Sequence, residues 1–131
     1  MKRFGLLILA ILVIAGWGFA EPNRDTIDFA MSGYIKALKS DNEGLRTSAL
    51  FQISKLKAKY PQTDLLPYFK ELEKVSRTDA NPIVRTQANL ALLVLKNPKL
   101  ASDVPAGWFV DPAKYFTQVY EQVYHAYSAE K

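Results

Sequence analysis

Two stretches of this chain, residues 42–56 and 81–95, repeat each other at a fixed spacing. Overlaying them aligns five identical pairs and matches apolar residues at further positions. The aligned pairs include Asn42 and Asn81, Arg46 and Arg85, Thr47 and Thr86, Ala49 and Ala88, Leu56 and Leu95, Leu45 and Val84, and Ile53 and Leu92. A period of about 40 residues is typical of stacked helix pairs, because no single pair can bury its apolar face without a neighbour. The repeat therefore predicts an all-α fold, arranged as a short α-solenoid of two helix pairs.

The first twenty residues have the pattern of an export signal. Lys2 and Arg3 form a positive start, residues 6–15 an apolar run, and the segment ends at Ala20 with a small residue two positions earlier. We expect cleavage after Ala20 and an exported protein in the periplasm of a Gram-negative bacterium. The alternative is an uncleaved anchor in the inner membrane, because residues 4–20 reach the lower limit of a spanning helix, about 17 residues.

The composition limits how the exported part can be held together and what it binds. The chain contains no cysteine, so its stability has to come from its core rather than from disulfides. Lysine and arginine number 17 against 13 acidic residues, and loss of Lys2 and Arg3 with the signal would leave 15 against 13. This small positive excess does not indicate a nucleic-acid partner.

Start and stop signals divide the rest of the chain into five helices and one connector. Asp25, Asn42, Thr63 and Asn81 are expected to start the first four helices, since their side chains can accept hydrogen bonds from the first turn. The fourth helix is apolar almost all round and is expected to be the most buried. The expected segments are repeat one at about 25–58, repeat two at about 63–96, an irregular connector at 97–110 and a last helix at 111–128.

The end of the chain is rich in aromatic residues. The segment 108–127 holds seven of the 16 aromatic residues of the chain. In the last helix one stripe at helical spacing contains Phe116, Tyr120, Val123 and Tyr127, with Tyr115 and Tyr124 on its flanks. One interpretation is that the aromatic residues cover the open end of the solenoid. The other is that Trp108, Tyr115 and Tyr124 stay partly exposed and anchor a protein partner.

The second repeat contains the run Leu65-Leu66-Pro67-Tyr68-Phe69, followed by Leu72, Asp79, Asn81, Val84, Arg85, Ala88 and Leu92. This pattern resembles a HEAT repeat. The first repeat is similar at Asp41, Leu45, Arg46, Ala49 and Ile53. It departs from the pattern in having Asp28 near the position of Pro67 and a turn that is one residue shorter. The resemblance covers about residues 27–95 and does not extend to the connector or the last helix.

The resemblance implies structural roles for several polar residues. In the HEAT family the acid of the turn and the arginine of the next helix form a ladder between neighbouring repeats, which here implies structural roles for Asp79 and Arg85 and for Asp41 and Arg46. It also implies that Pro67 lies about one turn into the third helix and bends its axis. The function implied by the family is that of a scaffold or adaptor.

Residues that carry catalysis or bind metals are scarce in this sequence. It has one histidine, no cysteine, no Gly-x-Ser-x-Gly elbow and no glycine-rich phosphate loop. His125 falls on the side of its helix away from the aromatic stripe, which indicates a solvated surface residue. We therefore expect no catalytic, cofactor-binding or metal-binding site, and no cofactor.

Two functions remain open from the sequence. The first is a non-enzymatic protein–protein interaction module, which would bind an unidentified envelope protein or pair with a second copy of the chain. The alternative is an apolar small-molecule binding protein, with a pocket between the connector and the last helix lined by Trp108, Phe109 and Tyr120. Contact with a membrane is expected only if the signal stays attached.

Overall fold

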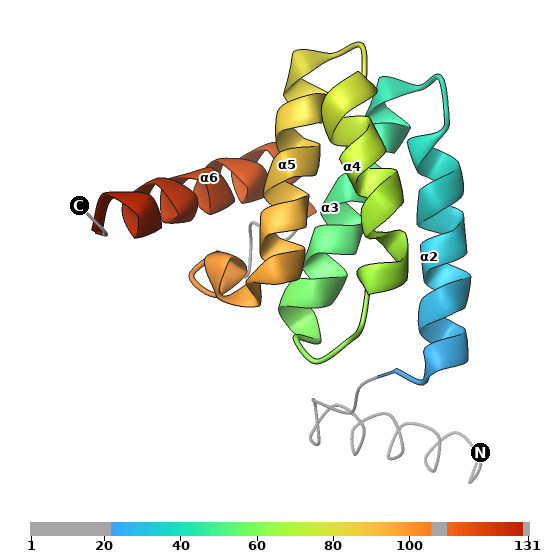
Figure 1. The fold of residues 1–131 in the computed structure, drawn as a ribbon, viewed down its shortest axis with the longest axis horizontal. Helices are drawn as coiled ribbons and strands as arrows, with labels where there is room; N and C mark the ends of the chain where they lie inside the picture. Colours follow the sequence, from blue (N-terminus) through green and yellow to red (C-terminus); the bar gives the residue numbers. More distant parts are fainter. Residues whose placement is uncertain (1–21, 106–109, 130–131) are drawn as a thin grey trace, which may run out of the picture.

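The computed structural model describes residues 22–105 and 110–129, and every regular element in these ranges is a helix (Figure 1). The elements are α2 (Arg24–Leu38), α3 (Glu43–Lys59), η1 (Leu66–Tyr68), α4 (Phe69–Thr78), α5 (Pro82–Lys96), η2 (Pro98–Ala101) and α6 (Pro112–Ala129). The two elements labelled η are short 3-10 helices. The predicted all-α class is confirmed, whereas the connector is not wholly irregular, because it contains η2.

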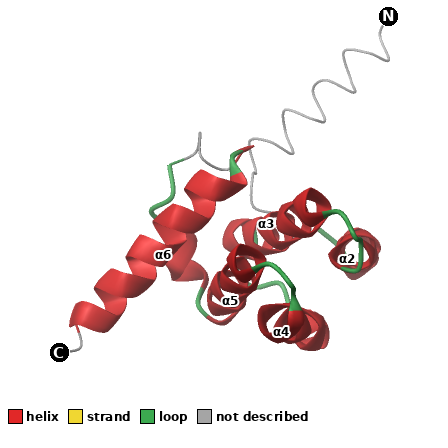
Figure 2. Ribbon diagram, turned by 90° about the horizontal axis from the view of Figure 1, so that it is seen from above, coloured by secondary structure: helices red, strands yellow, loops and turns green. Residues whose placement is uncertain are grey.

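The helices form two antiparallel pairs, α2 with α3 and α4 with α5, joined by short loops (Figure 1). Seen from above, α3 and α5 lie side by side in the middle, with α2 and α4 on one side of them (Figure 2). The last helix, α6, packs against α3 and α5 from the other side, and its second half extends beyond the other helices in both views. The central helices α3 and α5 are therefore the frame on which the others pack.

Asparagine caps start the second helix of each pair, as the aligned repeats predict. The Asn42 side-chain oxygen accepts the main-chain N–H of Leu45 at 3.1 Å, and that of Asn81 accepts the N–H of Ile83 at 2.8 Å. Pro82 occupies the first turn after Asn81, where the missing N–H leaves no hydrogen bond unmade. Equivalent residues of the two repeats thus begin equivalent helices.

The prediction that Asp25 caps the first helix is wrong. Asn23 does so, because its side-chain oxygen accepts the N–H of Thr26 at 2.9 Å and also its hydroxyl. Asp25 lies one position inside the helix, in the first turn. There its charge faces the positive end of the helix dipole, which is favourable without a capping hydrogen bond.

The third helix also starts later than predicted. After the buried Thr63, the carboxylate of Asp64 accepts the N–H of Leu66 at 2.9 Å and opens the 3-10 turn η1. Pro67 lies in that turn, and α4 begins only at Phe69. The expected bend inside the helix at Pro67 is therefore wrong, since proline precedes α4 and its missing N–H disturbs no α-helical hydrogen bond.

The core is centred on α5, as its all-round apolar sequence predicts. Eight residues of α5 are buried, against five of α3 and three of α2. Those of α5 are Val84, Gln87, Ala88, Leu90, Ala91, Leu92, Val94 and Leu95. Burial on several sides is what the position of α5 between α3, α4 and α6 requires.

Gly33 offers a direct test of the packing described for α2. It lies in the helix interior with nothing within 4 Å of the place where a β-carbon would stand. Gly33→Ala is expected to raise the free energy of unfolding by about 0.5–1 kcal/mol, because alanine reduces the entropy of the unfolded chain.

A second glycine provides the control for this substitution. At Gly44 a β-carbon would come within 3.2 Å of the Asn42 side-chain oxygen that caps α3. In urea unfolding experiments, Gly44→Ala should therefore raise the free energy of unfolding by less than Gly33→Ala does. A Gly33→Ala protein that is less stable than the wild type would contradict the free space beside Gly33.

Candidate interaction surface

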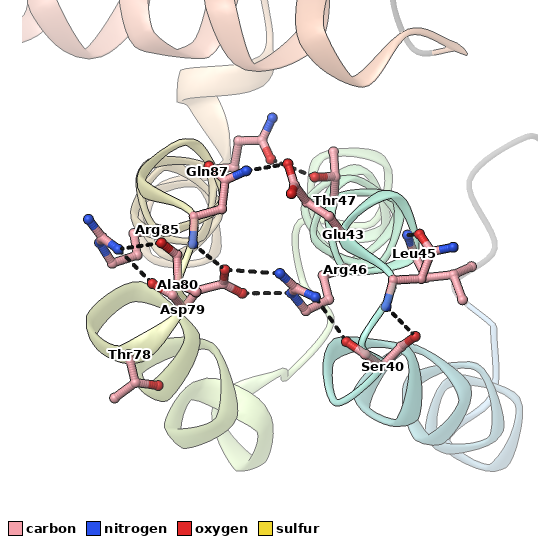
Figure 3. Close-up of polar contacts among 12 residues, drawn as sticks. Ser40, Glu43, Leu45, Arg46, Thr47, Thr78, Asp79, Ala80, Arg85 and Gln87 are labelled. Carbon is pink, nitrogen blue, oxygen red and sulfur yellow. Dashed lines mark hydrogen bonds and ion pairs between the residues drawn. The ribbon is translucent and has the colours of Figure 1, made fainter.

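Arg46 and Asp79 form a bidentate ion pair between the two helix pairs (Figure 3). The Arg46 guanidinium donates from Nε and Nη2 to the two carboxylate oxygens of Asp79, at 2.7 and 3.2 Å. Its Nη1 donates to the main-chain carbonyl oxygen of Ser40 at 3.0 Å. The two charged side chains are only 15% and 5% exposed. Shielding from water and paired hydrogen bonds make such a contact stronger than an ordinary surface ion pair.

The electrostatics of Asp79 agree with this geometry. Burial by itself would raise the pKa of the Asp79 carboxyl, but hydrogen bonds from Arg46 and from the main-chain N–H of Asn81 outweigh it, and the pKa is lowered. The hydrogen bond to Asp79 also raises the pKa of Arg46, against the effect of desolvation. Both groups are therefore charged at neutral pH, and the loop before α5 is tied to the start of α3.

The other two residues of the expected ladder have different roles. Arg85 donates from Nη1 to the main-chain carbonyl oxygen of Asp79 at 2.6 Å, so it closes its own turn and does not bind the Asp79 carboxylate. Asp41 acts on Arg46 through its charge, which helps to raise the pKa of that guanidinium. Of the four ladder residues, the structure thus joins Arg46 and Asp79 by a side-chain contact across the repeats.

Two further polar contacts join the same helix starts, and the sequence did not point to them. The amide of Asn81 donates to the carboxylate of Glu43. The hydroxyl of Thr47 donates to the side-chain oxygen of Gln87 at 3.1 Å (Figure 3). Both connect α3 to the second repeat. Aligned repeats show which positions are equivalent, but not which side chains face each other across the boundary.

The prediction that Tyr115 is a partly exposed partner anchor is wrong. The Tyr115 side chain is fully buried, and its hydroxyl lies 2.5 Å from the hydroxyl of the buried Ser54 on α3. Its ring makes edge-on contacts with Phe51 and Phe116, each with ring centres 5.2 Å apart. Burial raises the pKa of Tyr115 to about 12, and the hydrogen bond to Ser54 lowers it only in part. Tyr115 therefore anchors α6 to α3.

The exposed face of α6 carries three tyrosines. Tyr120, Tyr124 and Tyr127 are each more than half exposed, and their spacing places them on one side of the helix. Of the predicted stripe, only Phe116 is fully buried, so Tyr120 and Tyr127 do not serve to cover the open end of the helix pairs. The buried residues of α6 are Tyr115, Phe116 and Val119. The second half of α6 extends beyond the other helices (Figures 1 and 2), and its Val123 and Tyr127 line a further recess with Leu93 of α5 and Leu100 of η2.

A groove lies between the start of α5 and the first half of α6. Its volume is about 440 Å³, and it is open to solvent along one side. Pro82, Ile83, Thr86, Gln87, Leu90, Ala113, Phe116, Thr117 and Tyr120 line it. Tyr120 belongs both to this groove and to the tyrosine face of α6. Groove and tyrosine face together form one surface, named here the α5–α6 surface.

This surface only partly matches the pocket expected from the sequence. Tyr120 lines it, but its second wall is α5 and not the connector. Trp108 and Phe109 lie outside the described residues. Ile83 was missed as a surface residue, although it is largely exposed at the groove.

The described residues offer little other chemistry. Within 22–105 and 110–129, no three histidine, aspartate or glutamate side chains gather in a way that could hold a metal ion. His125 is exposed on α6, and its ring meets that of Tyr124 with centres 5.9 Å apart. Over the same ranges, no helix has the length and apolar character that a membrane span needs.

Comparison of the chain with protein-family models, with curated proteins and with solved structures finds no match. The class of protein has to be argued from its own residues. Three features carry that argument: the repeated helix starts, the polar contacts of Arg46 and Asp79 between them, and the α5–α6 surface.

Proposed function

We propose that this protein is a non-enzymatic interaction module, a scaffold or adaptor that binds protein through the α5–α6 surface. The observation that carries the proposal is a groove between two helices whose lining is mostly apolar and contains no charged residue. The three tyrosines of α6 extend it. Tyrosine suits such a role, because it combines a large apolar ring with a hydroxyl that can hydrogen-bond at the edge of an interface.

In this proposal the helix pairs form a short α-solenoid of the HEAT type, which serves as the frame of the surface. Support comes from the sequence period, from the equivalent caps Asn42 and Asn81, and from the Arg46–Asp79 pair that joins equivalent loops. Stacked repeats of this kind contact mainly their neighbours and leave extended faces for partners. The first half of α6 covers the open side of α3 and α5. In this proposal the groove between α5 and α6 is therefore the surface left free for a partner.

We place the protein in the bacterial periplasm or cell envelope. The proposal rests on the export-signal pattern of residues 1–20, which lie outside the described residues. An inner-membrane anchor formed by residues 4–20 is the alternative, and mass spectrometry of the N-terminus separates the two. A start at Glu21 supports export with cleavage, whereas a start at Met1 supports the anchor.

The test of the binding function is substitution of an exposed tyrosine. Tyr124→Ala should reduce the amount of partner captured with the tagged protein from the native envelope at least about fivefold, as removal of an aromatic anchor does. The melting temperature should change little, since Tyr124 is 62% exposed and contributes little to the core. Quantitative mass spectrometry of the captured material, together with thermal melts, measures both effects.

Phe29 provides the matched control for Tyr124. It is an exposed aromatic residue of α2. This helix lies on the side of α3 and α5 opposite to α6 (Figure 2). Phe29→Ala should leave the captured amount unchanged. Equal capture by the wild type and the Tyr124→Ala protein would show that the α5–α6 surface is not where protein binds.

A second function is favoured by the size of the groove. A volume of about 440 Å³ with mostly apolar walls lies in the range of small-molecule pockets, roughly 300–1,000 Å³. Against this, the groove is open along one side, so a ligand would remain partly in water. If an apolar ligand is the natural occupant, it should raise the melting temperature of the wild type and not that of an Ile83→Asp protein.

A further inference from the structure

We propose that the Arg85 side chain binds a carboxylate of the partner protein, an aspartate or glutamate next to the segment held in the α5–α6 groove. The inference rests on the proposed function, because it names one chemical group that the partner must carry. Its basis is the equivalence of the two repeats. Arg85 is the repeat equivalent of Arg46, and the contact of Arg46 with Asp79 shows which group an arginine in this position holds.

The two arginines share their first contact, which is with the turn before their own helix. Arg46 donates from Nη1 to the main-chain carbonyl oxygen of Ser40 at 3.0 Å, and Arg85 donates from Nη1 to that of Asp79 at 2.6 Å. A longer contact of the same Arg85 nitrogen reaches the carbonyl oxygen of Ala80 at 3.4 Å. One side of each guanidinium is therefore held by its own turn, which leaves Nε and Nη2 for another acceptor.

The two arginines differ at these remaining nitrogen atoms. In Arg46, Nε and Nη2 donate to both carboxylate oxygens of Asp79 in the next repeat. In Arg85, Nε and Nη2 have no acceptor among the described residues. Figure 3 shows the Arg85 side chain on the face of the second helix pair that points away from the first. Because a planar guanidinium binds a carboxylate through two parallel hydrogen bonds, this edge of Arg85 can hold one as Arg46 holds Asp79.

Arg85 lies beside the α5–α6 groove. Pro82 and Thr86 line the groove and are exposed, and around the helix they lie between Arg85 and the rest of the groove wall. A partner segment that fills the groove and extends past Thr86 would bring its next side chain to Arg85. The groove lining is uncharged, and Arg85 is the only charged residue in the stretch 82–95. Arg85 is therefore the charge on α5 that can select an acidic residue of the partner.

The face around Arg85 does not suit a further helix pair of the same kind. Leu50 of α3 is fully buried, whereas its repeat equivalent on α5, Asn89, is exposed. A polar residue at this position leaves no apolar face that a stacked repeat would have to cover. Ser40, the repeat equivalent of Asp79, has no carboxylate, so a second copy of this chain cannot repeat the contact in the same way. The occupant that fits is a different protein with an acidic residue at its contact surface.

The arginine Nε–H signals, measured by NMR on the isotope-labelled full chain, test the site directly. Sodium acetate is the probe, because it presents a single carboxylate, and sodium chloride at equal ionic strength controls for screening. The Arg85 signal should shift on addition of acetate, and by more than that of Arg77, an exposed arginine of α4. The Arg46 signal should stay in place, because Asp79 occupies its donors. An Arg85 signal that does not shift, or shifts no more than that of Arg77, would overturn the proposal.

Capture of the partner from the native envelope tests the same site in its natural complex. Arg85→Lys keeps the positive charge and loses the two parallel donors, so the captured amount should fall at least about fivefold. Arg77→Lys is the matched control and should leave the captured amount unchanged. Once the captured protein is known, changing its contacted acidic residue to the amide should cause the same loss. Combined with Arg85→Lys, that change should cause no further loss, which a merely structural role of Arg85 would not produce.

The failure of this inference can be told from the failure of the proposed function. If Tyr124→Ala reduces capture and Arg85→Lys does not, the carboxylate site is wrong and the α5–α6 surface stands. If neither substitution reduces capture, both proposals fail. Since Arg85 also holds its own turn, thermal melts accompany the capture experiment. If the Arg85→Lys protein melts at a much lower temperature than the wild type, the acetate titration of the wild type decides.

Discussion

Replacing Tyr115 with alanine is expected to lower the free energy of unfolding by about 3–5 kcal/mol, the largest effect of any substitution considered for this protein. Tyr115 is fully buried, and its ring packs edge-on against Phe51 of α3. Truncation removes these contacts and leaves a cavity where α6 meets α3. Urea unfolding followed by circular dichroism measures the loss.

A double-mutant cycle separates the hydroxyl of Tyr115 from its ring. Tyr115→Phe leaves the buried hydroxyl of Ser54 without the group that lies 2.5 Å away, which should cost about 1–3 kcal/mol. Ser54→Ala in the same protein removes the orphaned group, so the double variant should cost less than the sum of the single ones. A Tyr115→Ala protein that loses less than about 1 kcal/mol would contradict the packing of α6 on α3.

The second large effect is expected from Asp79→Asn, which should lower the melting temperature by about 5–10 °C at pH 7. The substitution keeps the shape of the side chain and removes the charge that pairs with Arg46, leaving a shielded guanidinium without its counter-ion. The effect should depend on pH. The folded state lowers the pKa of Asp79, so its stabilisation is present above the unfolded pKa of about 4 and is lost as the pH falls through the folded pKa.

The surface pair of Arg24 and Asp28 is the matched control. It is a single contact at 3.0 Å whose side chains are 44% and 47% exposed, and Asp28→Asn keeps an oxygen that can accept the hydroxyl of Tyr68. Asp28→Asn should lower the melting temperature by less than about 4 °C, because exposed pairs contribute little. If the Asp79→Asn and wild-type proteins differ as much at pH 2 as at pH 7, the charge of Asp79 is not what joins the helix pairs.

Short sequence patterns predicted the features that depend on residues close together in the chain. The overlay of 42–56 on 81–95 placed the caps Asn42 and Asn81, and the apolar sequence of α5 indicated its burial. At the start of α2 the local signal was not enough. Asn23 and Asp25 can both accept hydrogen bonds from a first turn, and only the backbone path before α2 decides between them.

The buried face of α6 could not be read from its spacing. Aromatic and aliphatic residues follow helical periodicity on two neighbouring faces, one through Tyr115 and one through Tyr120. Which of them is covered depends on the angle at which α6 crosses α3 and α5, a property of the whole fold. The contact of Arg46 with Asp79 could not be predicted for the same reason, because the two residues are distant in sequence and come close only when the helix pairs pack together.

Photo-crosslinking in living cells tests the central claim, that the α5–α6 surface binds protein, most directly. A benzophenone amino acid placed at position 124 should give a covalent adduct on illumination, and one placed at the exposed Lys36 position of α2 should give none. An adduct of twice the mass of the chain identifies a second copy, and any other adduct a different protein. Absence of an adduct from position 124, with the protein folded and present in normal amount, would contradict the account.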